Sequence, residues 1–355
     1  MKLFGRKEKS TGEILAGGEN AIANKEVEGL SQGQIVRRRF FRHRAAVIAL
    51  GVIATIILFV MTALDTKIGP IRIPGWWKWT VEDIPELRFE DCPGGTTGCP
   101  TLSLNPVGDF GMGTHPFGQD DIGRDYFALV MNGARRSLMI MFVIGAVAGF
   151  IGVVVGSIAG FYGKKVDSVL MRLVDFIQTV PTIIIAAVIG KAAGRVGPLF
   201  LALFLGILGW TGLARLVRAQ FLSLREMEFV DAARVAGASN IRIAFKHILP
   251  NAVGQIIVSI TLIMAGAILT ETALSYLGFG VVAPDVSLGL LISQYESSFT
   301  TRPWLFWWPG LFIIAIALCV NFIGDGLRDA FDPRQRRRIT KKDRLQAKVQ
   351  TKAGA

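Results

Sequence analysis

Histidine and cysteine, which commonly bind metal ions in proteins, occur only three times each in this chain of 355 residues. Neither their spacing nor that of the glycines and lysines matches a metal-binding or phosphate-binding motif. The three histidines, His43, His115 and His247, lie far apart, and no HExxH pattern places two of them on one helix face. A phosphate-binding loop around Lys164 is excluded, because it would need a glycine at Ile158 and serine or threonine at Lys165. We therefore expect no catalytic residue, no metal site and no cofactor, and the chain is not expected to be an enzyme.

Two of the three cysteines lie close together in sequence. Cys92 and Cys99 enclose a short loop rich in glycine. A spacing of six residues is unusual for zinc, and no histidine lies near, so a metal site is not expected. In an oxidising exterior such a pair forms a disulfide, which we predict here. Cys319 lies in an apolar stretch, where it is expected to pack as a small apolar residue.

The most informative pattern occupies residues 229–250 and predicts two short amphipathic helices. The apolar residues of the first recur with the spacing of one helix face: Phe229, Ala232, Ala233 and Ala236. Those of the second repeat the spacing: Ile241, Ala244, Phe245 and Ile248. Gly237 is typical of a residue with positive φ after a helix, Ser239 or Asn240 can cap the second helix, and Pro250 is expected to end it. The small side chains of Ala232 and Ala233 would allow another protein to approach closely.

The composition predicts that these helices belong to a membrane protein. Hydrophobic residues make up 51% of the chain and charged residues only 19%, with a mean hydropathy of +0.47. About 20 apolar residues span a bilayer. Six such segments are found, at roughly 45–64, 137–162, 169–190, 198–214, 252–270 and 304–324. The expected fold is therefore all-α, with six transmembrane helices.

Charged residues within these segments are candidates for gating or for lining a path, because charges are costly inside a membrane. Arg172 and Asp175 are three residues apart, so they share a helix face and could form a structural ion pair or take part in gating. Glu271, at the end of the fifth segment, could face the path or a partner subunit. Pro181 is expected to kink the third segment.

The basic residues predict the orientation. Ten Lys and Arg lie in 1–44 and ten beyond residue 324, whereas 65–134 has five against ten Asp and Glu. By the positive-inside rule both termini are cytoplasmic, together with the loop at 225–250. The net charge of +12 reflects this asymmetry, and nucleic-acid binding is not indicated. The expected divisions are a tail at 1–44, a first span at 45–64, an extracytoplasmic segment at 65–134, a five-span core at 135–325 and a basic tail at 326–355.

The 229–250 pattern resembles the "EAA" loop of permease subunits in type I ABC importers, which docks on the ATPase. The family pattern is Glu-Ala-Ala, three residues, Gly, and a helix ending near His-Leu-Pro. Asp231 replaces the usual Glu here, and the spacing is otherwise kept. The resemblance implies that the ATPase-coupling loop contains Asp231, Ala232, Ala233, Gly237, Ile241, Phe245, His247 and Pro250.

Stretches at 117–138, 171–181, 271–280 and 321–333 are also similar to the second permease subunit of dipeptide and oligopeptide ABC importers. The resemblance implies a multi-pass protein of the cell membrane that forms the path with a homologous permease. It further implies two cytoplasmic ATPases, which would bind ATP and Mg, and an extracytoplasmic peptide-binding protein. The external insert with Cys92 and Cys99 departs from the family pattern.

Two alternatives remain open at this point. The same architecture could import nickel chelates, haem or other small solutes, since relatives share these motifs. A stand-alone channel or secondary transporter is the alternative from another class. A secondary carrier is expected to show ion-coupling groups at the midplane and internal repeats, and no repeat is evident here.

Overall fold

The computed structural model describes residues 32–68, 71–88, 92, 96–102, 111–193 and 196–331. Most of the two basic tails, and Pro333 of the C-terminal motif, lie outside these ranges. The chain divides into two compact units, residues 1–43 with 329–355, and residues 44–328. The smaller unit contains helix α2 (Gln32–Arg42), and there His43 Nε2 lies 3.4 Å from Asp329 Oδ2. The larger unit contains the apolar helices.

Among the described residues, four helices are long and apolar enough to cross a membrane: α3 (Arg44–Ala63), α4 (Tyr126–Tyr162), the continuous helix Asn240–Tyr276, and α13 (Trp304–Phe331). Two bent pairs raise the number to six if each pair is one span. They are α5 (Lys164–Thr179) with α6 (Thr182–Ala193), and α7 (Pro198–Gly209) with α8 (Thr211–Leu224). The membrane-protein class expected from composition therefore fits the structure.

The bend between α5 and α6 measures 70° and falls at Pro181. Proline has no N–H to donate and forces the preceding residue out of the helical region. Val180 accordingly has φ −89° and ψ 126°. The predicted kink at Pro181 is confirmed.

Helix α4 begins well before Ser137, where its apolar segment was expected to start. Its first turn is capped by Asp125, whose carboxylate accepts a hydrogen bond from the Ala128 N–H at 2.9 Å. The first turns of α4 are apolar and buried, but Asn132, Arg135 and Arg136 separate them from the apolar segment that was expected to start at Ser137.

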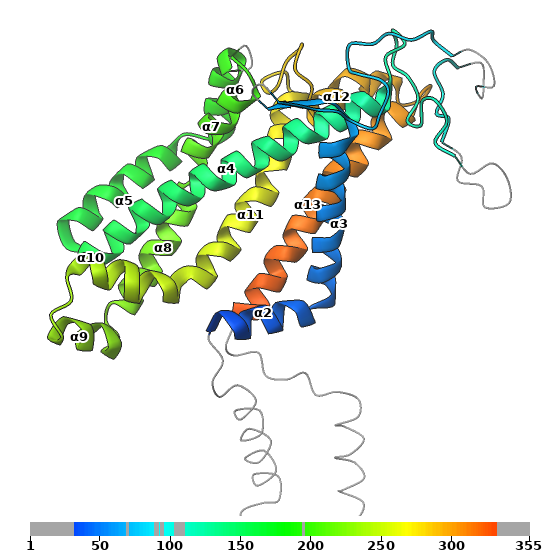
Figure 1. The fold of residues 1–355 in the computed structure, drawn as a ribbon. Helices are drawn as coiled ribbons and strands as arrows, with labels where there is room; N and C mark the ends of the chain where they lie inside the picture. Colours follow the sequence, from blue (N-terminus) through cyan, green and yellow to red (C-terminus); the bar gives the residue numbers. More distant parts are fainter. Residues whose placement is uncertain are drawn as a thin grey trace, which may run out of the picture. The chain divides into compact units, whose positions relative to one another are not determined.

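Helix α4 packs closely on α8 because it presents glycines four residues apart (Figure 1). A Cβ at Gly152 would lie 2.9 Å from the Leu213 side chain, and one at Gly156 would lie 2.7 Å from Cβ of Val217. At Gly160 the Arg218 carbonyl oxygen would be 2.7 Å away. Small residues at this spacing let two membrane helices approach backbone to backbone. The GxxxGxxxG pattern was readable in the sequence but was not part of the predictions.

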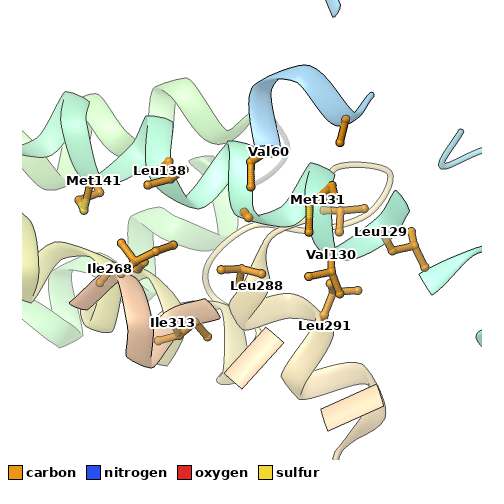
Figure 2. Packing of buried hydrophobic residues seen from close by; sticks show 14 of the residues in the cluster. Val60, Leu129, Val130, Met131, Leu138, Met141, Ile268, Leu288, Leu291 and Ile313 are labelled. Carbon is orange, nitrogen blue, oxygen red and sulfur yellow. The ribbon is translucent and has the colours of Figure 1, made fainter. Parts of the chain in front are cut away.

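The largest buried cluster joins α3, α4, α11 (Leu249–Tyr276), α12 (Leu288–Tyr295) and α13. Figure 2 shows side chains from these helices meeting along α4. Its labelled members are Val60, Leu129, Val130, Met131, Leu138, Met141, Ile268, Leu288, Leu291 and Ile313. This core is formed mainly at the end of α4 that follows the 65–125 segment.

The described residues of the 65–125 segment are mostly irregular. It starts with a hairpin of β1 (Thr66–Ile68) and β2 (Ile71–Ile73), paired antiparallel. Two further short elements lie elsewhere: α9 (Glu228–Val235), and the 3₁₀ helix η3 (Glu296–Ser298) after α12. Apart from the hairpin, the regular structure of the described residues is helical.

Candidate functional site

The segment 228–250 forms two helices joined by a sharp turn. Helix α9 ends in a Schellman motif, in which the Ala238 N–H donates to the Ala233 carbonyl at 3.0 Å and the Gly237 N–H to the Arg234 carbonyl at 2.9 Å. Gly237 has φ +79°, as the pattern predicts. Ser239 then caps the next helix by accepting from the Arg242 N–H at 3.4 Å. The hinge between the two helices is therefore set by local backbone chemistry.

The single apolar face expected on α9 is divided in the structure. Val230 is fully buried and Ala233 is partly buried against the same chain, whereas Phe229, Ala232 and Ala236 are exposed. Ala232 and Ala233, which were both expected to allow close approach of another protein, therefore differ in accessibility, because Ala233 packs partly on the buried cluster beneath α9. Ala232 is left as the accessible small side chain of the pair.

Asp231 lies on the exposed side of α9. Its carboxylate accepts from Arg234 Nη1 at 2.9 Å, one helical turn further on. About 65% of its side chain is accessible, so the ion pair is open to solvent and contributes little stability. The carboxylate therefore remains accessible to a basic group of another protein.

The second helix contains a π-helical turn, η2 (Ile243–Ile248), between α10 (Asn240–Arg242) and α11. In a π turn the hydrogen bonds run from residue i to i+5. Ile243 and Ile248, five apart, are both fully buried, while Ile241 and Phe245 are 69% and 62% exposed. The buried face of this turn is therefore formed by residues five apart, and not by the residues that share one face of a regular α-helix.

Pro250 does not end the helix, contrary to the prediction. It stands in the first turn of α11, and the helix continues from Asn240 to Tyr276. Proline is tolerated where no intrahelical donor is required, and the π turn before it alters the bonding ladder at that point. His247 is half-buried, and its carbonyl accepts from Asn251 Nδ2 at 2.7 Å.

The segment is fastened to two long helices by an apolar cluster. Val230, Ile243 and Ile248 pack with residues of α8 and of α11, namely Leu213, Val217, Phe221, Ala252 and Ile256. The segment is therefore packed against both helices through buried side chains.

Asp175 is paired differently from the expectation. Its Oδ1 lies 2.5 Å from Nη2 of Arg215 on α8, and Arg172, three residues earlier, is exposed on α5. A second ion pair between the same two helices joins Asp167 and Arg218. The i, i+3 pair of Arg172 and Asp175 does not form, because α8 offers Asp175 a closer guanidinium.

Glu271 faces neither a path nor a partner subunit, contrary to both readings. It is fully buried within the chain, where Ser137 of α4 donates to its Oε2 at 3.0 Å and Ser275 donates to its Oε1 at 2.8 Å. Ser137 Oγ also accepts from the Leu288 N–H at 3.3 Å. The carboxylate thus ties α11 to α4 and, through Ser137, to the start of α12.

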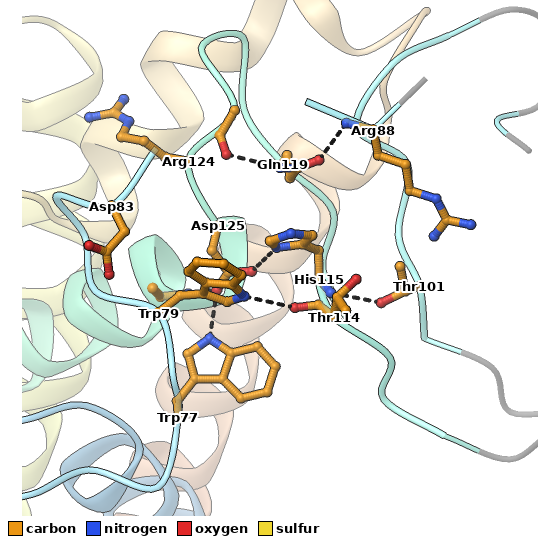
Figure 3. Close-up of polar contacts among 12 residues, drawn as sticks. Trp77, Trp79, Asp83, Arg88, Thr101, Thr114, His115, Gln119, Arg124 and Asp125 are labelled. Carbon is orange, nitrogen blue, oxygen red and sulfur yellow. Dashed lines mark hydrogen bonds and ion pairs between the residues drawn. The ribbon is translucent and has the colours of Figure 1, made fainter. Parts of the chain in front are cut away.

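Figure 3 shows how the irregular segment is held on the start of α4. Asp125 accepts from Trp77 Nε1 at 2.8 Å, and its Oδ1 lies 2.8 Å from His115 Nδ1. Trp79 stacks on the His115 ring with centroids 5.4 Å apart. Gln119 accepts from the Arg88 N–H at 2.9 Å. The motif at 117–125 therefore builds a turn and a helix cap.

Three further contacts secure this end. Asp120 accepts from Arg124 Nε at 2.6 Å and from the Tyr295 hydroxyl at 3.2 Å. Burial raises the pKa of Tyr295 above its usual value, and the negative charge of Asp120 raises it further. The hydroxyl therefore stays protonated and can donate this hydrogen bond. Cys92 and Cys99 are joined by a disulfide, with Cα atoms 5.5 Å apart.

No group of three or more His, Cys, Asp or Glu is placed to hold a metal ion in the part of the chain that the structure describes. Among those residues, the polar clusters around Asp125 and Glu271 serve to join elements. The candidate functional surface is that of residues 228–250, which we call the coupling segment after the role that the sequence predicts for it.

Comparisons with known proteins identify the family of the chain. Residues 152–337 match the family described as "Binding-protein-dependent transport system inner membrane component", and residues 31–66 match the "N-terminal TM domain of oligopeptide transport permease C". The oligopeptide transport system permease protein OppC of Escherichia coli is 37% identical over 318 residues, which covers 90% of this chain and 96% of that protein. The protein of the same name from Mycobacterium tuberculosis is 36% identical over 310 residues, with 87% and 97% covered. That from Bacillus subtilis is 41% identical over 223 residues, with 63% and 73% covered. The chain therefore belongs to the family of inner membrane components of binding-protein-dependent transport systems.

Proposed function

We propose that this chain is a permease subunit of an ATP-driven ABC importer for oligopeptides. This chain is similar, over nearly their whole length, to proteins of Escherichia coli and Mycobacterium tuberculosis that are named oligopeptide permeases. The observation that carries the proposal is the coupling segment, which is anchored by buried residues yet keeps Ala232, Ile241 and Phe245 exposed. Exposed apolar groups beside a small residue suit the docking of another protein.

The proposed complex has four kinds of protein. A homologous permease completes the path, two ATPases bind ATP and Mg, and an extracytoplasmic binding protein delivers the peptide. Binding and hydrolysis of ATP are assigned to the ATPases, because this sequence has no phosphate-binding loop. The basic tails favour a cytoplasmic position for both termini, which would put the coupling segment on the side of ATP.

The proposed mechanism is mechanical. Closure of the ATPases moves α9, and the cluster of Val230, Ile243 and Ile248 carries α8 and α11 with it. Because α8 also pairs with α5 through Asp175 and Arg215, the movement reaches the bent pair α5–α6. Arg172 and Asp175, both exposed on α5, are our candidates for gating or for contact with the path.

Peptide selection is assigned to the binding protein, so the path need only accept varied side chains. A decisive experiment is reconstitution of the complete transporter in vesicles, with uptake of a labelled pentapeptide measured with and without ATP. ATP-dependent uptake supports the proposal. Uptake of a nickel chelate or haem, with none of peptides, would instead favour the other solutes considered for this architecture. Uptake by this chain alone would contradict the importer assignment.

A further inference from the structure

The end of α4 is held by an arginine that comes from another part of the chain. Arg225 follows α8 directly, and its Nη1 donates to the main-chain carbonyls of Gly160 and Phe161, at 3.3 Å each. Both carbonyls belong to the last turn of α4, where a helix has no N–H groups of its own to satisfy them. A positive charge is also favourable there, because it lies at the negative end of the helix dipole. Arg225 therefore caps α4 from the end of α8.

The turn between α4 and α5 leaves space for this side chain because it contains Gly163. Gly163 is buried and has φ +63°, a conformation that glycine adopts without strain. A Cβ atom at Gly163 would lie 2.8 Å from Arg225 Nη1, so the guanidinium would have to move away from the carbonyls. Arg225 Nε donates instead to Glu226 Oε1, at 2.8 Å. The contacts of Arg225 with α4 and with Glu226 therefore use different nitrogens.

Arg225 also lies in the short connection between α8 and the coupling segment. Only three residues, Arg225, Glu226 and Met227, separate α8 from α9. The Met227 carbonyl already accepts from the Val230 N–H at 2.9 Å, so α9 begins directly after the connection. The covalent path from α9 to α8 is therefore short, and the side chain of Arg225 links this path to the end of α4.

We propose that Arg225 is a positioning residue for ATP coupling, which ties the coupling segment to the turn between α4 and α5. The inference rests on the proposed function, in which the ATPases move α9. During this movement the two hydrogen bonds of Arg225 hold the turn against the end of α8, and the turn leads into α5 and the break at Pro181. Ala232, Ile241 and Phe245, the exposed residues assigned to docking, are separate from Arg225. Loss of Arg225 should therefore uncouple ATP hydrolysis from import without releasing the ATPases.

The test uses the complete transporter in vesicles, in which ATP hydrolysis and uptake of a labelled pentapeptide are measured together. Arg225→Met keeps an unbranched side chain and removes the donors. We expect this variant to keep both ATPases and to hydrolyse ATP, but to import about tenfold fewer peptides per ATP, since one hydrogen bond to a charged group corresponds to a factor of that size. Arg225→Lys keeps a charged donor and should recover part of the loss. Lys165→Met, which removes an exposed positive charge from the start of α5, should keep the wild-type ratio.

A second substitution tests the contact itself. Gly163→Ala places a methyl group where it displaces Arg225 Nη1, so it should also lower the number of peptides imported per ATP. Combined with Arg225→Met it should lower this number no further, because the contact is already lost. Losses that add in the double variant would show that the two residues act independently, which would contradict the proposal.

Thermal unfolding of each purified variant in detergent separates coupling from stability. A wild-type number of peptides per ATP for Arg225→Met, together with a lower melting temperature, would make Arg225 a structural cap alone and would overturn the proposal. The wild-type transporter distinguishes this inference from the proposed function. If the wild type imports peptide with ATP and the variants do so equally well, only the role of Arg225 fails. If the wild type imports no peptide, the proposed function fails.

Discussion

The two ends of the long helices in the larger unit are built on opposite principles. At the end near the 65–125 segment, polar groups are buried and paired: Asp125 with His115 and Trp77, and Glu271 with Ser137 and Ser275. At the coupling segment, apolar groups such as Val235, 91% exposed, are left in contact with solvent. A buried polar group gains stability from partners within the chain, whereas an exposed apolar group gains it when another molecule covers it. The contrast predicts that these polar groups matter for the stability of the chain itself, and that the exposed apolar groups matter for assembly with other proteins.

The comparison is tested most strongly at Asp125. Asp125→Ala removes the helix cap of α4 and leaves the buried groups of His115 and Trp77 without their acceptor. Each buried group left unsatisfied costs about 1–3 kcal/mol and the loss of a helix cap about 0.5–2 kcal/mol, so we expect a large loss of thermal stability. Unfolding of the purified chain in detergent is the measurement, and Asp125→Asn is the control that keeps one acceptor oxygen. An unchanged melting temperature for the alanine variant would show that this end is not held by its polar network.

A second large effect is expected at Glu271. Glu271→Leu orphans the hydroxyls of Ser137 and Ser275, at about 1–3 kcal/mol for each unsatisfied group. Glu271→Gln keeps the acceptor oxygen and should be much milder. If glutamine lowered transport while stability stayed constant, the carboxylate would have a functional role beyond joining α11 to α4.

The opposite behaviour is expected at the coupling segment. Ala232→Trp places a bulky side chain on the exposed face of α9, so the chain should keep its stability and lose the ATPases on purification. Overpacking a fitted contact costs about 1–3 kcal/mol. Ala233→Trp is the matched comparison, because Ala233 packs against its own chain and its replacement should also loosen the segment. Retention of the ATPases by both variants would remove α9 from the interface.

A smaller effect is predicted for Gly237→Val. An added Cβ meets nothing within 4 Å, so the cost comes only from the positive φ, at about 1–2 kcal/mol. We expect normal insertion but reduced ATP-driven uptake, because the second helix is misdirected. ATPase stimulation and uptake are measured together in the assembled complex. Wild-type values for both would mean that the hinge does not set the coupling geometry.

The smallest effect is expected for Asp231→Ala. Its ion pair with Arg234 is largely exposed, and such pairs are worth about 0–1 kcal/mol. Stability should be unchanged, and ATPase retention should fall less than in Ala232→Trp. A reversed order, measured by the same pull-down in low and high salt, would make the docking electrostatic.

Much of the fold could be predicted because the length and hydropathy of an apolar segment are enough to identify a membrane-spanning helix. The break at Pro181 and the positive φ of Gly237 were also predictable, since both follow from the covalent structure of one residue. The boundaries were less accurate. The start of α4 depends on a cap by Asp125 and on packing beyond the membrane, and apolar periodicity carries neither signal.

The candidate site shows where sequence reasoning ends. The pattern at 229–250 predicted the two helices and the turn at Gly237, but it did not show that Ala233 is less accessible than Ala232, and it ended the second helix at Pro250. Periodicity says which residues share a face of an ideal helix. It does not say which face lies inward, nor that a π turn will shift the face so that Ile243 and Ile248 are buried together.

By itself, the sequence determined the membrane class, the family pattern and the local turns, because these depend on composition and on neighbouring residues. The tertiary structure alone decided that Asp175 pairs with Arg215 and that Glu271 is buried beside Ser137. The members of those pairs are 40 and 134 residues apart, and their meeting depends on how closely the helices pack. On α4 and α8 that packing is allowed by glycines, where any larger side chain would separate the two backbones.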